Sequence, residues 1–229
     1  MFVDKNYQKQ GVGTKLLKLA EDALISSGVN SITLASYSPN YFFWGIDKTA
    51  YPNAAAFFAK HGYIETEEHY SMGRDLHNYV IPKEVKEKQI DAENLGYKFI
   101  NFNYSYTLDL LNFLRDEFGG GWKRNALIAM QNNTAEDVLT LVVDKNNKIC
   151  GCCNRAIDGN PSRIGPIGIA KDKRNASLGS VLFCYTLFEM SKKGIYHVYF
   201  ITTNKDGKRY YERMGLKVIR TSTDFVKNL

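Results

Sequence analysis

The stretch that decides the fold is Arg174-Asn175-Ala176-Ser177-Leu178-Gly179-Ser180, together with an earlier counterpart, Gln8-Lys9-Gln10-Gly11-Val12-Gly13-Thr14. Each stretch opens a segment with the apolar periodicity of a helix. Backbone N–H groups in the first turn of a helix have no intrahelical partner, and the helix dipole is positive there. Small residues in such a turn let a phosphate or pyrophosphate come close. We therefore expect the chain to bind a ligand that carries phosphate groups.

Length and composition narrow the class of protein. The chain has 229 residues, of which 44% are hydrophobic, which is enough to bury a core in one large domain or somewhat more. The sequence has no apolar run of membrane-spanning length and no basic-then-apolar leader, so we expect a cytoplasmic protein without a membrane partner. The net charge of +6 favours anionic partners. We do not expect nucleic acid among them, because the lysines are scattered and the dense run at 83–88 alternates in sign.

The four cysteines do not indicate a metal site. Cys150, Cys152 and Cys153 crowd into one apolar run, and Cys184 lies in a helical pattern, with no second Cys or His pair at ligand spacing. The sequence predicts reduced cysteines that act neither as metal ligands nor as exposed nucleophiles.

A repeat extends beyond the two turns. Residues 54–63 and 207–216 each predict a short helix that ends in a glycine suited to a left-handed C-cap, and a β-rich run precedes each, at 31–35 and 196–201. From Gly13 to Gly62 is 49 positions and from Gly179 to Gly215 is 36, so the first half has 13 extra residues. They are expected within 37–53, an aromatic stretch that we predict to pack on a domain surface.

The two halves differ in what precedes the turn. The second half has a strand at 96–102, helices at 106–118 and 122–130, and strands at 137–143, 149–156 and 164–170. The first half has only residues 1–7, enough for the end of one strand. We predict a partial domain at 1–76, a linker with a short helix at 77–94, and a complete domain at 95–229.

Taken together, these motifs resemble those of the GNAT N-acetyltransferases, and the likeness covers nearly the whole chain. The family's turn begins with Arg or Gln, and after two residues continues with Gly, any residue, then Gly or Ala. Gln8, Gly11 and Gly13 fit this pattern without a break. In the second half Arg174 and Gly179 fit, whereas Ser177 takes the first glycine position; serine is small and a good N-cap, so the turn can survive.

The resemblance implies a fold, a co-substrate and a set of contacts. The fold would be α/β: two tandem mixed, mostly antiparallel sheets flanked by helices, the first incomplete, with a parallel pair of strands that separates around the cofactor. The co-substrate would be acetyl-CoA, with no metal. Its implied contacts are Ile169, Arg174, Asn175, Ala176, Ser177, Leu178, Gly179, Ser180 and Asn204 in the second half, and Val3, Gln8, Gly11, Val12, Gly13 and Thr14 in the first.

A later family motif points to the chemistry. Its pattern of Asn, Ala, Tyr and Gly is matched by Asn204, Gly207, Tyr211 and Gly215, with glycine in place of alanine. The resemblance implies that Tyr211 donates a proton to the departing CoA thiolate as a general acid, and the alternative is that it only fills the core. Phe58 stands at the same place in the first half, which predicts a supporting half without this chemistry.

The predicted function is direct acetyl transfer from acetyl-CoA to a small-molecule or peptide amine of unknown identity, catalysed by the second half. No general base is evident in the sequence. Two other interpretations stay open: a non-catalytic acyl-CoA-binding or assembly protein, and a fragment whose true start lies upstream. A homodimer that covers the incomplete first sheet is a further prediction, because a bare sheet edge invites association.

Overall fold

A computed structural model describes residues 1–35, 44–174 and 177–229 of the chain. The chain forms two compact units, and each unit is assembled from more than one segment of the sequence. Unit 1 comprises Met1–Ser71, Ile201–Arg209 and Val218–Leu229, and unit 2 comprises Met72–Phe200 and Tyr210–Lys217. None of the helices in the described residues has the length and apolar character that crossing a bilayer requires.

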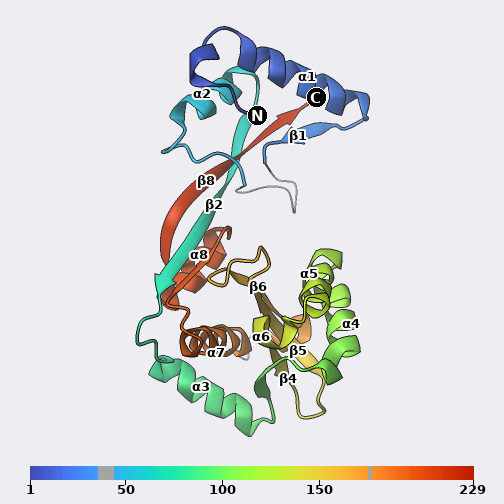
Figure 1. Cartoon of the computed structure of the whole chain (residues 1–229), viewed down its shortest axis with the longest axis vertical. Coiled ribbons are helices and arrows are strands. Elements are labelled where there is room, and N and C mark those ends of the chain that lie inside the picture. Colours follow the sequence, from blue (N-terminus) through green and yellow to red (C-terminus); the bar gives the residue numbers. More distant parts are fainter. Residues whose placement is uncertain (36–43, 175–176) are drawn as a thin grey trace. The chain divides into compact units, whose positions relative to one another are not determined.

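Unit 2 is built on an antiparallel sheet with the strand order β3-β4-β5-β6 (Figure 1). The strands are β3 (Lys98–Asn101), β4 (Leu139–Val143), β5 (Ile149–Arg155) and β6 (Ile164–Ile169). All five residues of β4 are buried, which indicates that both faces of the sheet are covered. Side chains alternate between these faces, so Leu141 packs in one core cluster while Thr140 bonds to Thr186 on the opposite side.

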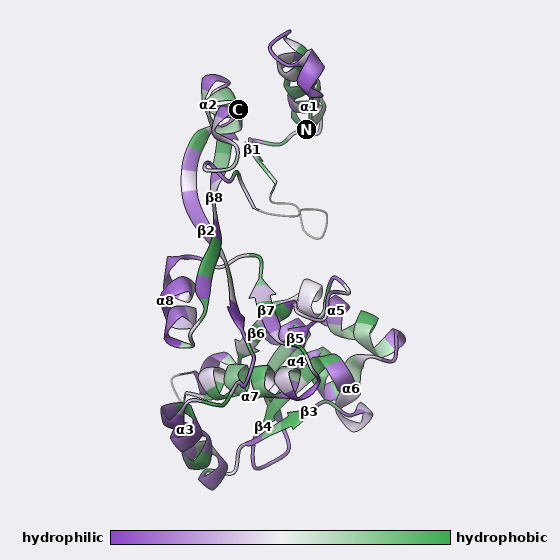
Figure 2. Cartoon of the chain, turned by 60° about the vertical axis from the view of Figure 1, so that its left-hand side comes forward, coloured by the Kyte–Doolittle hydropathy of each residue, from purple (hydrophilic) through white to green (hydrophobic). Residues whose placement is uncertain are grey.

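Two layers of helices cover the sheet of unit 2. On one face lie α4 (Thr107–Phe118), α5 (Gly120–Gln131) and the short α6 (Ala135–Val138), whose apolar residues share a cluster with β4 and β5. On the other face lies α7 (Leu178–Lys192), which is buried along most of its length. The helix α3 (Lys83–Asn94) packs against α7. Figure 2 shows the contrast between them: α7 is largely hydrophobic, whereas α3 is largely hydrophilic.

The sheet of unit 2 opens after β6. The next strand, β7 (His197–Phe200), belongs to a different sheet and meets the start of β6 through one parallel bridge, between Arg163 and Tyr199. Beyond that bridge the two strands separate, as the resemblance implied. The other edge of β7 pairs with the end of β2 (Ile64–Asp75), with Met72 opposite Phe200 and Asp75 opposite His197.

Unit 1 contains a smaller core. Its elements are the 3₁₀-helix η1 (Lys5–Tyr7), α1 (Val12–Ser26), β1 (Ser31–Thr33), α2 (Pro52–Lys60), most of β2, and most of the long strand β8 (Lys217–Asn228). The strand order β1-β8-β2 places Ser31 opposite Asn228 and Thr33 opposite Val226. The buried cluster consists of Leu17, Ile32, Ile46, Tyr63 and Phe225.

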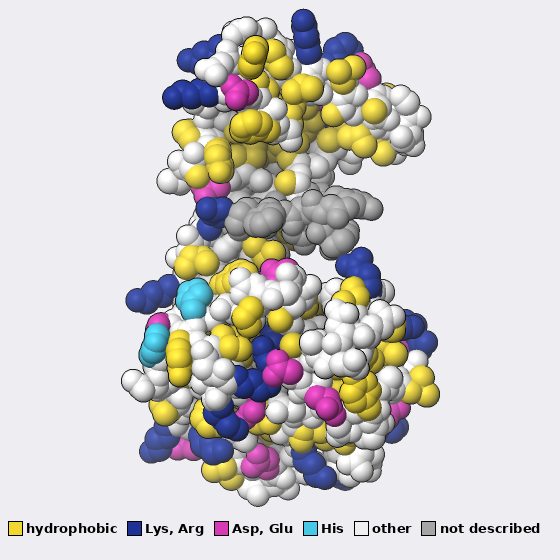
Figure 3. Space-filling view, in the orientation of Figure 1, with side chains coloured by type: hydrophobic (Ala, Val, Ile, Leu, Met, Phe, Trp, Pro, Cys, Tyr) yellow, Lys and Arg dark blue, Asp and Glu magenta, His cyan; other side chains and the backbone are white. Residues whose placement is uncertain are grey.

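The helix α1 of unit 1 is covered far less than its counterpart α7. Both helices have fifteen residues, yet of α1 only Leu17 is buried among the described residues of the chain. Leu19 is 67% exposed and Phe2 is 84% exposed. Figure 3 shows hydrophobic side chains gathered on this unit, in the upper part of the view. In unit 2 the strands β4, β5 and β6 cover α7, and unit 1 shows no equivalent strands among its described residues.

The predicted fold class is confirmed, with two differences in detail. Residues 1–7 contain no strand, because 5–7 form a 3₁₀ turn instead. The strand predicted from Asp137 begins at Leu139, since 135–138 form the helix α6. The long strands β2 and β8 pair with strands from the opposite halves of the sequence, and the domain bounds 1–76, 77–94 and 95–229 stay a prediction. The aromatic stretch 37–53 lies partly outside the described residues; within it, the Trp44 ring meets His69 edge-on at 4.8 Å.

Candidate active site

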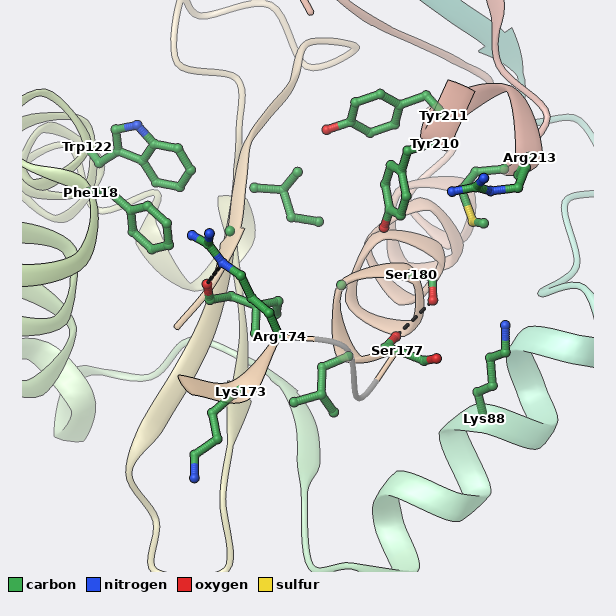
Figure 4. A pocket seen from close by; sticks show the side chains of 16 residues that line it. Lys88, Phe118, Trp122, Lys173, Arg174, Ser177, Ser180, Tyr210, Tyr211 and Arg213 are labelled. Carbon is green, nitrogen blue, oxygen red and sulfur yellow. Dashed lines mark hydrogen bonds between the residues drawn. The ribbon is translucent and has the colours of Figure 1, made fainter. Parts of the chain in front are cut away.

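A cavity of about 580 Å³ opens in unit 2 where β6 and β7 separate (Figure 4). Its walls come from the end of β6, the turn that follows it, the start of α7, the end of α8 (Lys205–Arg213), and single positions on α3, α4 and α5. The lining residues are Lys88, Phe118, Trp122, Ile167, Gly168, Ile169, Lys173, Arg174, Ser177, Leu178, Gly179, Ser180, Tyr210, Tyr211, Arg213 and Met214. The cavity thus collects most of the second-half residues that the sequence predicted.

At the free edge of β6, the peptide N–H of Ile169 faces the side where β6 and β7 separate. Ala170 donates its N–H to the carbonyl of Cys150 on β5. Because hydrogen-bonding groups alternate along an antiparallel strand, the N–H and C=O of Ile169 face the opposite edge. The side chain of Arg174 confirms that orientation for the carbonyl, since its Nε donates to the oxygen of Ile169 at 3.4 Å. The Ile169 N–H is therefore available on the side where a thioester carbonyl was predicted.

The turn before α7 presents the positive end of a long helix to the cavity. Ser177 is the N-cap residue and has a left-handed backbone, with φ of 57°. Its side chain makes no capping hydrogen bond, contrary to the expectation that serine acts there as a capping residue. Instead, the hydroxyl of Ser180 donates to the Ser177 carbonyl at 2.8 Å. Asn175 and Ala176 lie outside the described residues.

Tyr211 reaches the cavity from α8 and is held by other rings. Its ring lies 4.5 Å from that of Phe200 and 5.3 Å from that of Phe183. Burial, with a smaller contribution from Cys153, raises the pKa of Tyr211 above the ordinary value of a phenol. The hydroxyl therefore keeps its proton over the physiological pH range, as a proton donor requires.

Tyr210 also lines the cavity, which the sequence did not predict. The Tyr210 hydroxyl points at the turn and lies 3.5 Å from the place that a Cβ on Gly179 would occupy. Burial raises the pKa of Tyr210 as well. A Cβ at Gly179 would be in ordinary contact with this hydroxyl, so the hydroxyl lies directly beside the start of α7.

An aromatic pair forms the opposite wall. The rings of Phe118 and Trp122 stack with 4.2 Å between their centroids and 13° between their planes. Phe118 ends α4 and packs on Gly168 of β6, where any side chain would overlap its ring. Residues 118–122 therefore form a helix junction, and the rings of Phe118 and Trp122 face the cavity (Figure 4).

Some predicted contacts do not lie at this cavity. Asn204 belongs to unit 1, and its side chain accepts the N–H of Gly207 at 2.9 Å, as a helix cap does. The first-half candidates Val3, Gln8, Gly11, Val12, Gly13 and Thr14 also belong to unit 1. There Gln8 donates to the Val3 carbonyl at 3.0 Å, which repeats the bond between Arg174 and Ile169. Phe58 packs against the unit 1 core, with its ring 5.4 Å from that of Tyr63.

The cysteines are buried and therefore poor nucleophiles. Cys150, Cys152, Cys153 and Cys184 are all free and buried. Burial raises the pKa of Cys150 and of Cys153 to about 12, which keeps both as neutral thiols. Within residues 1–35, 44–174 and 177–229, no cluster of His, Cys, Asp or Glu is suited to hold a metal ion.

Comparisons with known proteins agree with this geometry. Residues 1–65 match the acetyltransferase (GNAT) domain, and residues 107–216 match the acetyltransferase (GNAT) family. Among curated proteins no relative was found. The matching segments together contain both turns and both short helices of the repeat.

Solved structures show the same fold at low sequence identity. One is a GCN5-related glucosamine N-acetyltransferase region of a fungal multi-domain GH3 β-N-acetylglucosaminidase, with a TM-score of 0.82 and 20% identity; it covers 98% of this chain, which spans only 29% of that protein. A GCN5-related N-acetyltransferase from Sphaerobacter thermophilus has a TM-score of 0.69 and 15% identity over 99% of this chain and 70% of its own. A tandem GNAT protein from the clavulanic acid biosynthesis pathway has a TM-score of 0.61 and 15% identity. The match covers 99% of this chain and 73% of that protein. The open edge of β6 and the helix N-terminus at the cavity agree with the two matching segments. The chain belongs to the GNAT acetyltransferase superfamily and carries two of its domains in tandem.

Proposed function

We propose that unit 2 transfers an acetyl group from acetyl-CoA to a primary amine by direct attack of the amine on the thioester. The observation that carries the proposal is the cavity that brings together the N–H side of Ile169, the first turn of α7 and the Tyr211 phenol. The pyrophosphate would lie at the helix N-terminus, and the thioester carbonyl would accept the Ile169 N–H. Tyr211 would donate a proton to the CoA thiolate as the amide forms.

Direct transfer fits the state of the cysteines. A covalent acetyl-enzyme would need a reactive thiolate, and all four thiols are buried. In the direct reaction the amine nitrogen bonds to the acetyl carbon and the carbon–sulfur bond breaks. The amine proton leaves to water, because none of the described residues that line the cavity is Asp, Glu or His.

We propose an amino sugar such as glucosamine as the first acceptor to assay. The fungal structure with the same fold is a glucosamine N-acetyltransferase region, and the stacked Phe118–Trp122 pair offers a flat apolar wall beside the predicted thioester position. An aromatic face is also attractive to the ammonium form of an incoming amine. Peptide amines and polyamines are the comparison acceptors.

The same lack of a carboxylate or imidazole supports one alternative, a protein that binds acyl-CoA without turning it over. Calorimetric titration with acetyl-CoA, followed by a thiol-release assay with the amine panel, separates the two. Saturable binding with thiol release in the presence of an amine supports acetyl transfer. Binding without release from any amine supports the alternative, and absence of binding refutes both.

A further inference from the structure

Cationic side chains line the cavity on both sides of the first turn of α7. Lys173 and Arg174 precede the turn, Lys88 comes from α3, and Arg213 comes from the end of α8. Figure 4 shows Lys88 and Arg213 on one side of the turn and Lys173 with Arg174 on the other. Since no acidic residue occurs among the described lining residues, both sides favour an anion.

The two sides differ in how far their cations are already engaged. Lys173 lies 3.5 Å from the carboxylate of Asp172, and Arg174 donates to the Ile169 carbonyl. In the described part of the chain, Lys88 and Arg213 have neither an ion pair nor a side-chain hydrogen bond. Their charges therefore face the cavity without a protein anion to neutralise them.

The placement of Lys88 is a property of the fold. The helix α3 buries Val85, Gln89 and Ala92 and packs against α7, which fixes the backbone that carries Lys88. The other two lysines of α3 are paired within the helix. Lys83 lies 3.9 Å from Glu87, and Lys86 donates to Gln89 at 3.1 Å. Lys88 is the lysine of this helix that reaches the cavity.

CoA carries two separate anionic groups, a pyrophosphate and a phosphomonoester on the ribose 3′ position. The helix N-terminus accounts for the first. The monoester has its own charge and needs donors of its own, which Lys and Arg side chains supply best. We propose that Lys88 and Arg213 form a second anion subsite that binds the 3′-phosphate, so that this protein selects CoA over its 3′-dephospho form. The inference rests on the proposed use of acetyl-CoA.

The test is calorimetric titration of the full chain with acetyl-CoA and with 3′-dephospho-acetyl-CoA. We expect the wild type to bind acetyl-CoA about tenfold more tightly, as one charge-assisted contact to phosphate provides. Lys88→Gln and Arg213→Gln should each remove most of that preference by weakening acetyl-CoA alone. Lys88→Arg should restore it, and Lys86→Gln, on the same helix but outside the cavity, should leave it unchanged. The preference should also fall as salt is added.

Three results would overturn the inference. They are equal binding of the two ligands by the wild type, a loss in Lys88→Gln that is the same for both ligands, and a preference that survives both substitutions. All three leave the proposed function intact, because acetyl-CoA still binds. Failure of acetyl-CoA to bind the wild type at all would instead refute the proposed function.

Discussion

Gly11 and Ser177 occupy equivalent positions in the two halves of the chain. Each is the N-cap of a fifteen-residue helix, and each has a left-handed backbone, with φ of 80° at Gly11 and 57° at Ser177. Glycine adopts this conformation freely, whereas a residue with a side chain is strained there. The turn in unit 2 therefore keeps the geometry of the glycine turn although it has lost the glycine.

Ser177→Gly should stabilise the protein. The substitution removes the cost of a left-handed serine, and it sacrifices no capping bond, because the Ser177 side chain makes none. Against this, glycine adds entropy to the unfolded chain, so the net gain should be up to about 1 kcal/mol. Urea unfolding followed by circular dichroism measures this change in the free energy of unfolding. Gly11→Ser is the matched control and should lower the unfolding midpoint. A lower midpoint in Ser177→Gly would contradict the claim that the Ser177 backbone is strained.

Tyr211→Phe should slow turnover while acetyl-CoA binding is retained. The hydroxyl would act on the leaving thiolate only as the bond breaks, so its loss should lower kcat by ~10²-fold and leave the calorimetric Kd nearly unchanged. The ring stays in place against Phe200 and Phe183. Tyr210→Phe, a neighbouring phenol on the same helix, is the control that should keep its kcat. Unchanged kcat in Tyr211→Phe would remove Tyr211 from the mechanism.

The raised pKa of Tyr211 should determine where kcat falls at high pH. The protonated phenol is the active form, so activity is lost as pH rises through the folded-state pKa. Burial sets that pKa above the ordinary phenol value, so the loss should begin above about pH 10. A limb near pH 8 that disappears in Tyr211→Phe would contradict this assignment.

Gly179→Val should reduce acetyl-CoA affinity by more than about tenfold, because the side chain fills the cavity between helix start and ligand. A Cβ at Gly179 meets Tyr210 at 3.5 Å and Ile169 at 3.6 Å, which is ordinary contact, so Gly179→Ala should fold normally and bind with a smaller loss. Titration calorimetry measures the acetyl-CoA affinity of both variants. Wild-type affinity in Gly179→Val would contradict the placement of the ligand at this turn.

The first-half turn offers a matched substitution. At Gly13 a Cβ meets the Phe57 ring at 3.6 Å and Val3 at 3.8 Å, much as at Gly179. If only unit 2 binds, Gly13→Val should leave both the affinity and a stoichiometry of about one per chain unchanged. A stoichiometry near two in the wild type that falls in Gly13→Val would show that the first turn also binds.

Gly168→Ala should destabilise unit 2. A Cβ at Gly168 would overlap the Phe118 ring. The ring cannot move aside without breaking its stacking on Trp122, and the strand backbone is fixed by its pairing with β5. Overpacking of this kind costs about 1–3 kcal/mol. Thermal unfolding measures the cost, and Phe118→Leu in the Gly168→Ala background should recover part of it. A Gly168→Ala protein as stable as the wild type would show that the pair repacks freely.

Local sequence signals predicted the local structure well. The glycines at 62 and 215 both have the left-handed backbone expected of helix C-caps, with φ of 85° and 81°. The turns, the helices after them and the sheet of unit 2 follow from periodicity and from residues that suit only certain backbone angles. Tyr211 and the turn residues were assigned to one site by the resemblance to the GNAT family, and they line the same cavity.

What escaped prediction depends on contacts between distant residues. The sequence analysis gives no bounds for the strands β2 and β8, and their choice of partner depends on contacts between residues far apart in the sequence. One example is the 2.8 Å bond between His69 and Asp224, which are 155 positions apart. Lys88 was missed because the alternating charges of α3 look the same whether the helix is a solvated linker or is docked on α7. The burial of Val85, Gln89 and Ala92 is what distinguishes the two, and only the tertiary structure reveals it.

The exchange of long strands makes the two repeats complementary rather than independent. β1 from the first half pairs with the end of the chain, and β7 from the second half pairs with residues 72–75. A gene divided between the repeats would encode two fragments that each lack a strand the other holds. Such fragments should reassemble when mixed, in the manner of a split reporter, and neither should be soluble by itself. The two halves therefore depend on each other for folding even where their chemistry differs.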